Sequence, residues 1–325
     1  MTGPVSSSVL SRRPRDASRH VAHEDNCREP LKPEGVPPIG PNMNSMLRPC
    51  EELPIRVLWL DEPETADPNL AGGKAAALAR MTHRYPVPPA FVLPWTAFGE
   101  DGRLLVDGLD EAYGRLSADS VAVRSSAVGE DGRDASFAGQ HATILHVRDR
   151  EALRAAIYAC WQSAHSEAAL LYRARRTAEQ AERPRISVLV QAMVRADAAA
   201  VGFSRAPAGY GIDLMLINAT LGLGESLVSG EVTPDVIAVS RADLSIVRHE
   251  IAEKGRMSVM ADEGVVERSV PRRLQHRPAL DEIQVRDLAR MMQALEEEWE
   301  MPVDVEACWD AHGLHLLQCR PITAV

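Results

Sequence analysis

The sequence is poor in several features that mark common classes of protein. Only 4% of its 325 residues are aromatic, so the interior must be packed mainly with Ala, Leu, Val and Met. No apolar run approaches the roughly 20 residues that a membrane-spanning helix needs, and the first residues lack the apolar segment of a secretory signal. The five cysteines show no CxxC or other metal-ligand spacing. We therefore expect a cytoplasmic protein with reduced thiols and no membrane contact.

Lysine is scarce as well. Of the 36 basic residues only three are lysines, namely Lys32, Lys74 and Lys254. Each marks a position where a compact ammonium is used in a chain that otherwise uses the planar guanidinium of arginine. The net charge of −10 argues against a general nucleic-acid-binding protein. It still permits a small anionic ligand, because local charges matter more than the total charge.

Composition divides the chain into a tail and a folded body. Residues 1–50 contain eight prolines, six serines and no aromatic residue, so we expect a disordered tail. The chain is 45% hydrophobic, which is ample for a buried core, and the remaining residues mix helical and strand patterns. We expect an α+β fold of two lobes, the first over residues 51–190 and the second over residues 191–325.

Hydrophobic periodicity predicts the main elements. Helices are expected over residues 74–84, 151–180 and 281–299, the last with Asp281 as its N-cap. Strands are expected over residues 121–124, 186–194, 199–205, 212–218, 235–240 and 244–251. The chain should close on a hairpin of strands 303–310 and 314–320, with its turn at Ala311-His312-Gly313.

Two glycines precede the first helical stretch, and Lys74 follows them directly. Glycines at a helix start expose backbone N–H groups, and the helix dipole favours an anion there. Lys74 would add a positive charge for phosphate, although the stretch is not a Walker A loop, which needs GxxxxGK followed by Ser or Thr. An ordinary glycine turn with a solvated lysine would leave the same pattern.

A second candidate is the strand that begins at Val121 and carries Arg124 into a stretch of small residues. Arg124 could hold a phosphate with both ends of its guanidinium. Small residues nearby would let phosphates approach closely and would offer hydroxyl and N–H donors. These residues are Ser125, Ser126, Ser136, Gly139 and Thr143. An ordinary strand and loop with a surface salt bridge is the alternative.

The closing hairpin brings an acid, an amide and a cation together. With the turn centred on His312, Glu306 lies opposite Gln318. The same register places Asp304 opposite Arg320, and the period of two puts all four side chains on one face. Opposed Cβ atoms lie about 4.5–5.5 Å apart, so oxygens of Glu306 and Gln318 could share one Mg²⁺. A solvated hairpin face with a cross-strand ion pair would also fit.

Several short stretches together resemble one protein family. They are Gly72-Gly-Lys-Ala-Ala-Ala-Leu, Val87-Pro-Pro-Ala-Phe-Val, Val123-Arg-Ser-Ser-Ala, Ala135-Ser-Phe-Ala-Gly-Gln140, Val190-Gln-Ala-Met-Val194, Asn218-Ala-Thr-Leu-Gly-Leu-Gly-Glu225, Val228-Ser-Gly-Glu-Val-Thr-Pro-Asp235, Val303-Asp-Val-Glu306 and Leu317-Gln-Cys-Arg-Pro-Ile322. In order and spacing they are similar to the ATP-binding domain of phosphoenolpyruvate synthase, pyruvate phosphate dikinase and rifampin phosphotransferase. The resemblance runs from about residue 53 to residue 322.

The resemblance implies an ATP-grasp-like fold with ATP between the two lobes. The nucleotide contacts that it implies are Lys74, Arg124, Gly139, Thr143, Gln191, Met193, Glu306, Gln318 and Arg320. Within this set Lys74, Arg124 and Arg320 would contact the phosphates and take part in catalysis. Glu306 and Gln318 would hold Mg²⁺, which agrees with the hairpin register above.

The family passes the β-phosphoryl of ATP to a histidine, with AMP and phosphate as products, and a swivelling domain carries it to an acceptor. This sequence contains no glycine-rich stretch that ends in Thr-Ser-His, and the domain that binds pyruvate or phosphoenolpyruvate is missing too. We therefore expect a phosphotransferase subunit that phosphorylates a histidine on a separate partner protein, or a small molecule directly. A nucleotide-binding regulatory module without turnover and a fragment of a longer enzyme remain the alternatives.

Overall fold

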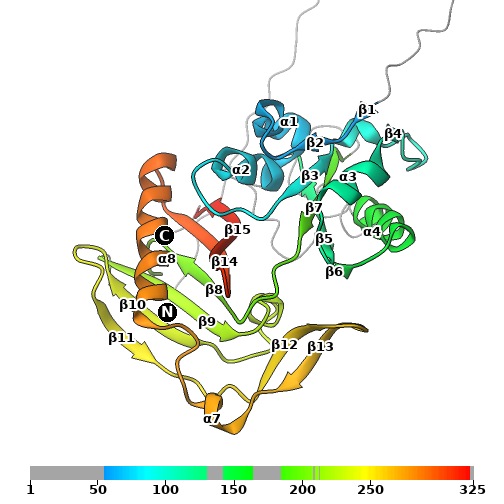
Figure 1. The fold of residues 1–325 in the computed structure, drawn as a ribbon. Helices are drawn as coiled ribbons and strands as arrows, with labels where there is room; N and C mark the ends of the chain where they lie inside the picture. Colours follow the sequence, from blue (N-terminus) through cyan, green and yellow to red (C-terminus); the bar gives the residue numbers. More distant parts are fainter. Residues whose placement is uncertain (1–54, 130–141, 164–183, 208, 212, 323–325) are drawn as a thin grey trace, which may run out of the picture. The chain divides into compact units, whose positions relative to one another are not determined.

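The computed structural model describes residues 55–129, 142–163, 184–207, 209–211 and 213–322. Figure 1 shows their elements in chain order. The expected tail over residues 1–50 and the candidate site residue Gly139 lie outside the described residues. No helix in the described part of the chain is both long and apolar enough to cross a membrane.

Five antiparallel strands form the first sheet, in the order β2-β3-β7-β5-β6. They are β2 Leu58–Trp59, β3 Ala90–Leu93, β5 Val121–Ala127, β6 Thr143–Val147 and β7 Ile186–Ala192. The central strand β7 is buried along nearly its whole length, as expected for a strand that is covered on both faces. One face packs against α2 (Gly73–Met81), and the other packs against α3 (Leu109–Arg115) and α4 (Arg150–Ser163).

Six antiparallel strands form the second sheet, in the order β11-β10-β9-β8-β14-β15. They are β8 Ala198–Phe203, β9 Leu214–Leu221, β10 Asp235–Ser240, β11 Ile246–Glu250, β14 Val303–Asp310 and β15 Gly313–Pro321. Residues such as Ile217 and Val305 pack with helix α8 (Glu282–Trp299) in one hydrophobic core. The alternate residues face the other side, where Glu306 pairs in register with Gln318. The second sheet therefore has one core face and one face that can carry a site.

Helix α8 begins with the predicted N-cap. The side chain of Asp281 accepts a hydrogen bond from the backbone N–H of Gln284, and the Gln284 side chain accepts one from the backbone N–H of Asp281, both at 2.9 Å. This capping box satisfies two backbone donors that a helix start leaves unpaired. The predicted helix over residues 281–299 is confirmed.

Shorter elements complete the described chain. They are β1 Ile55–Arg56, β4 Val106–Asp107, the 3-10 helices Pro63–Ala66 and Trp95–Ala97, α1 Pro68–Ala71, α6 Glu225–Val228, β12 Arg256–Ala261, β13 Gly264–Ser269 and α7 Arg272–Gln275. Strand β1 pairs with β4 in parallel, and β12 pairs with β13 in a hairpin that the sequence did not predict. The mixture of sheets and helices confirms the predicted α+β fold class.

Several predicted boundaries differ from the structure. Helix α2 ends at Met81 rather than at residue 84, because the chain turns there before Pro86. Strand β7 ends at Ala192, so Gln191 belongs to the first sheet and the chain crosses to the second sheet over residues 193–197. Helix α4 is described only to Ser163, and the rest of the predicted helix, residues 164–180, lies outside the described residues.

The closing hairpin reaches the predicted register by a different route. Its loop has two residues, because Asp310 pairs with Gly313, so the predicted turn centred on His312 is wrong. A β-bulge between Glu306 and Ala307 then shifts the register and leaves Leu317 without a cross-strand partner. Beyond this bulge, the predicted pairs Glu306 with Gln318 and Asp304 with Arg320 are both confirmed.

Candidate functional site

Lys74 lies in the first turn of α2, which is fixed against β5. Gly72 has a φ of 79°, and a Cβ on it would lie 2.1 Å from the backbone oxygen of Ser126, so a glycine is required there. The backbone N–H of Ala75 donates to Ser126 Oγ at 3.0 Å. Lys74 Nζ donates to the backbone oxygen of Ser125 at 3.2 Å. One N–H group of this helix start is therefore bonded within the protein rather than offered to an anion.

Arg124 reaches from β5 in the first sheet to β15 in the second. Its Nη1 donates to the backbone oxygen of Leu317 at 3.0 Å, and its Nη2 donates to Gln318 Oε1 at 2.7 Å. The same Nη2 lies 3.6 Å from Glu306 Oε2. The bulge that leaves Leu317 unpaired in the ladder thus supplies a carbonyl acceptor for one end of the guanidinium. Arg124 therefore links the candidate motif on β5 directly to the closing hairpin.

Arg320 forms an ion pair with Asp304 across the hairpin. Its Nε donates to Asp304 Oδ2 at 2.7 Å, and the side chain of Arg320 remains 44% exposed. Burial raises the pKa of Asp304 above its ordinary value, and Glu306 adds to the rise while Arg320 opposes it. The cross-strand ion pair that the sequence left open therefore exists, and its cation is accessible to solvent.

Glu306 and Gln318 fit a divalent cation by the chemistry of their donors. Both present a side-chain oxygen to the same nitrogen, Nη2 of Arg124, so the two oxygens converge on one cationic atom. Carboxylate and amide oxygens are ligands that Mg²⁺ accepts. The described residues contain no group of three or more His, Cys, Asp or Glu that could hold a metal. Phosphate and water oxygens would therefore have to complete the shell.

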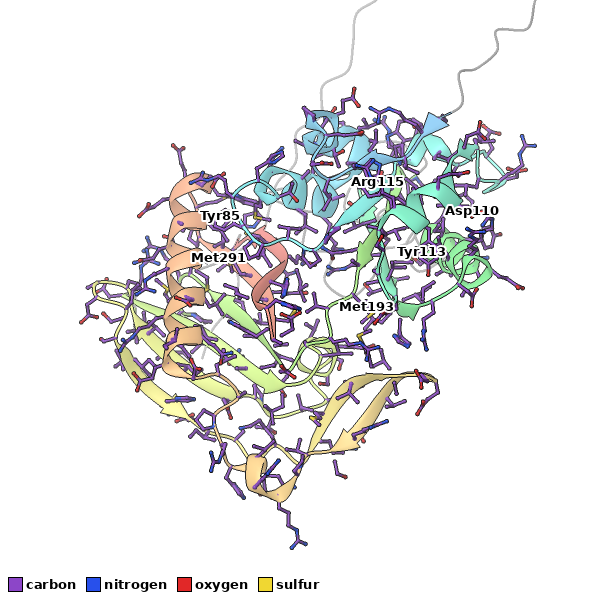
Figure 2. The ribbon with its side chains drawn as sticks, viewed as in Figure 1. Tyr85, Asp110, Tyr113, Arg115, Met193 and Met291 are labelled. Carbon is purple, nitrogen blue, oxygen red and sulfur yellow. The ribbon has the colours of Figure 1, made fainter. Side chains whose placement is uncertain are left out.

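Gln191 and Met193 lie where the chain leaves the first sheet; Figure 2 shows Met193 between β7 and the second sheet. Gln191 is 2% exposed, and its Nε2 is buried without a hydrogen-bond partner. The backbone N–H of Met193 donates to the backbone oxygen of Ser120 at 3.0 Å, so it is already bonded. Thr143 pairs in register with Arg124 on the neighbouring strand. Of these three positions only Thr143 is a direct strand partner of Arg124, because Gln191 pairs with Ala122 and Met193 lies beyond the end of β7.

Sequence reasoning missed two residues on the site face of the second sheet. Asn218 pairs with Val201, which in turn pairs with Glu306, so these three residues form one row across the sheet. Thr220 lies two residues further along β9 and faces the same side. Its Oγ1, like Ser226 Oγ, is buried without a hydrogen-bond partner. The available signal was their place in or beside the stretch from Asn218 to Glu225.

A cavity of about 660 Å³ lies beside the crossover between the sheets. It is lined by Pro86, Val87, Pro88, Pro89, Ala192, Met193, Val194, Arg195, Asp197, Asp310, Ala311, His312 and His315. This cavity shares Met193 with the predicted site but contains none of Lys74, Arg124 and Glu306. The candidate phosphate-binding residues therefore gather around Arg124 and do not line this cavity.

Comparison with known proteins identifies one family model and several curated relatives that match this chain. A family described as the pyruvate phosphate dikinase AMP/ATP-binding domain matches residues 103–325. The uncharacterized phosphotransferase YvkC of Bacillus subtilis is 34% identical over 282 residues, which cover 79% of this chain and 34% of that protein. A probable phosphoenolpyruvate synthase of Methanocaldococcus jannaschii is 32% identical over 320 residues, covering 83% of this chain and 27% of that protein.

A rifampicin phosphotransferase of a Streptomyces species is 36% identical over 221 residues, covering 68% of this chain and 25% of that protein. The chain thus spans about a quarter to a third of the length of these three curated relatives. Among solved structures, acetyl-coenzyme A synthetase 1 of Ca. Korarchaeum cryptofilum matches with a TM-score of 0.40 and 14% identity, covering 77% of this chain and 91% of that one.

Proposed function

We propose, from the premise that this chain belongs to the pyruvate phosphate dikinase AMP/ATP-binding domain family, that it binds ATP and transfers a phosphoryl group from it. The observation that carries this proposal is the contact of Arg124 with Gln318 and Glu306, which joins two motifs far apart in the sequence. Phosphoryl transfer needs little covalent chemistry from the protein and depends on positioning and charge.

The charges of the site suit the triphosphate of ATP. Lys74, Arg124 and Arg320 provide three cations. On β5, Arg124 directly precedes Ser125, whose backbone oxygen accepts the hydrogen bond from Lys74. Fixed cations near the reacting phosphate stabilise the charge that spreads over its oxygens in the transition state. We assign phosphate binding and catalysis to these three residues.

Glu306 and Gln318 would hold a Mg²⁺ ion in this proposal. When bound, such an ion would neutralise charge on the phosphates. The residues of this chain would orient it, because both side-chain oxygens are directed to one point by the hairpin register. Gln191, Met193, Thr143 and Gly139 would complete the nucleotide contacts on the first lobe.

The proposed products are AMP and phosphate, by resemblance to the dikinases. The proposed acceptor is a histidine on a separate swivel-domain protein, or a small molecule. A Thr-Ser-His segment is absent from the 325 residues, and the relatives named above are much longer, so the acceptor and the partner are proposals of their own. A regulatory module that binds nucleotide without turnover, and a fragment of a longer phosphoenolpyruvate synthase-like enzyme, are the alternatives.

Calorimetry with ATP and Mg²⁺ tests the proposal. We expect the wild-type protein to bind ATP, and Lys74→Ala to weaken that binding at least tenfold while the protein still folds. Arg80→Ala is the matched control, because Arg80 lies on the same helix and its exposed side chain donates to the backbone oxygen of Ala66. Absence of binding by the wild type at millimolar ATP would reject the function.

Phosphorus NMR of the reaction mixture separates the enzyme from the regulatory module. Formation of AMP and phosphate, alone or with a swivel-domain protein of the family added, would support dikinase chemistry. ADP as the product would retain a kinase but reject the dikinase. Tight binding without any turnover under either condition would favour the regulatory module.

A further inference from the structure

The oxygens assigned to the metal are also the oxygens that Arg124 holds. Its Nη2 lies 2.7 Å from Gln318 Oε1 and 3.6 Å from Glu306 Oε2. Its Nη1 bonds to the backbone oxygen of Leu317, which the β-bulge has released from the ladder. The two ends of the guanidinium therefore bond to two adjacent residues of β15. The positive charge of Arg124 occupies the place that a metal ion would have to enter.

The balance of charge makes this overlap consequential. Two cationic side chains, Arg124 and Arg320, contact two carboxylates, Glu306 and Asp304, and Lys74 bonds to the backbone oxygen of Ser125, next to Arg124. A divalent cation added alone would give an excess of positive charge to a partly buried site, where Arg124 and Glu306 are 12% and 23% exposed. Electrostatic repulsion is stronger there than in bulk water. The triphosphate of ATP would reverse the balance and give Arg124 another anionic partner.

We propose that Arg124 and a divalent cation compete for the side-chain oxygens of Glu306 and Gln318, and that nucleotide phosphates admit the metal by drawing the guanidinium away. Arg124 then serves two purposes in succession, first as an internal counter-ion and then as a phosphate ligand. This inference rests on the proposed function for its nucleotide. By linkage, nucleotide and metal each raise the affinity of the site for the other by the same factor.

The competition predicts effects of opposite sign from one substitution. Arg124→Met removes the guanidinium but retains much of its apolar stem, so it should strengthen the binding of metal in the absence of nucleotide. The same substitution should weaken ATP binding, because a phosphate ligand is lost. If Arg124 only supported the fold, its substitution would weaken both metal binding and ATP binding.

The test measures free Mn²⁺ by electron paramagnetic resonance, without nucleotide. We expect Arg124→Met to bind Mn²⁺ at least tenfold more tightly than the wild type, and Glu306→Gln in the same chain to abolish that gain. Arg124→Lys keeps a charge but lacks the fork, so it should show a smaller gain of about threefold. Arg148→Met is the matched control, because Arg148 is an exposed arginine that pairs with Asp262 outside the site.

The outcomes separate this inference from the proposed function. Wild-type ATP binding with no gain in Mn²⁺ affinity in either Arg124 variant would overturn the competition and leave the function standing. A gain in Mn²⁺ affinity in a protein that does not bind ATP would support the competition and reject the proposed function. If Arg124→Met fails to fold, Arg124→Lys decides by whether it raises or lowers the affinity for Mn²⁺. Added millimolar guanidinium should then lower the Mn²⁺ affinity of Arg124→Lys.

Discussion

Two cation–carboxylate contacts in this molecule differ in how completely they are enclosed. Lys254 Nζ lies 2.5 Å from Asp235 Oδ1, and the two side chains are 1% and 0% exposed. Arg124 Nη2 lies 3.6 Å from Glu306 Oε2, and those side chains are 12% and 23% exposed. The first contact is short and closed, whereas the second is longer and reached by solvent.

The surroundings of the two contacts deepen the contrast. Asp235 also accepts hydrogen bonds from the backbone N–H groups of Ala252 and Ala279, at 2.8 and 2.7 Å, and Lys254 also donates to the backbone oxygen of Ala252. Every one of these bonds joins segments of the second lobe, so Asp235 fastens three chain segments together. Arg124 instead bonds from the first sheet to β15 of the second, and its contact with Glu306 is partly exposed to solvent. A closed ion pair fastens the fold, and an open one can serve chemistry.

Asp235→Asn should have the largest effect on stability. It leaves the Lys254 ammonium buried without its carboxylate, and breaking a buried pair in this way typically lowers the free energy of unfolding by about 3–5 kcal/mol. Urea denaturation is the measurement. Asp262→Asn, which removes an exposed partner of Arg148, should change stability by less than about 1 kcal/mol. A similarly small effect for Asp235→Asn would mean that closure of the pair contributes little.

Glu306→Gln should separate function from stability. We expect Mg²⁺-dependent turnover to fall by about 10²-fold, because a fixed charge at the phosphates is lost. Binding of ATP without metal and the free energy of unfolding should change little. Asp310→Asn, at the other end of β14, is the control for the strand. Equal losses in metal-dependent turnover and metal-free binding would contradict the assignment of Glu306 to the metal.

The same contrast shows what could be read from the sequence. The rarity of lysine drew attention to Lys74 and Lys254, and the structure gives both buried ammonium groups specific acceptors. The N-cap of α8 at Asp281 followed from a local rule of sequence spacing. The pairing of Glu306 with Gln318 was predicted correctly from a wrongly placed turn, because the β-bulge at Leu317 offsets the error in the turn. Local rules suffice where a structure depends on residues a few positions apart.

Other features depended on contacts between distant segments. The bulge at Leu317 was not predictable, because its gain is the bond between its carbonyl and Arg124, nearly two hundred residues earlier. The bond of Ala75 to Ser126 likewise joins α2 to a strand that local patterns cannot place beside it. Isolated polar atoms such as Thr220 Oγ1 become visible only after packing. The sequence therefore indicated candidate residues, whereas their partners within the protein became visible only in the structure.

Asp304→Asn should have the smallest effect, and it acts through pH. Burial raises the pKa of Asp304 in the folded protein above its ordinary value. Between those two pKa values the folded state binds more protons than the unfolded state, so the free energy of unfolding falls as pH rises through that interval. An asparagine cannot titrate, so it should remove this fall while its amide oxygen still accepts a bond from Arg320.

Urea denaturation of wild type and Asp304→Asn at a series of pH values from about 3.5 upward measures the difference between them. The wild-type curve should lose stability relative to the variant with increasing pH, because the buried carboxylate becomes charged. The opposite slope would show that Arg320 outweighs burial and that this pair is closed in the manner of Lys254 and Asp235. Parallel curves would place the pKa of Asp304 at its ordinary value. Either result would remove Asp304 from the open, adjustable part of the site and leave Arg320 as a fixed member of the hairpin.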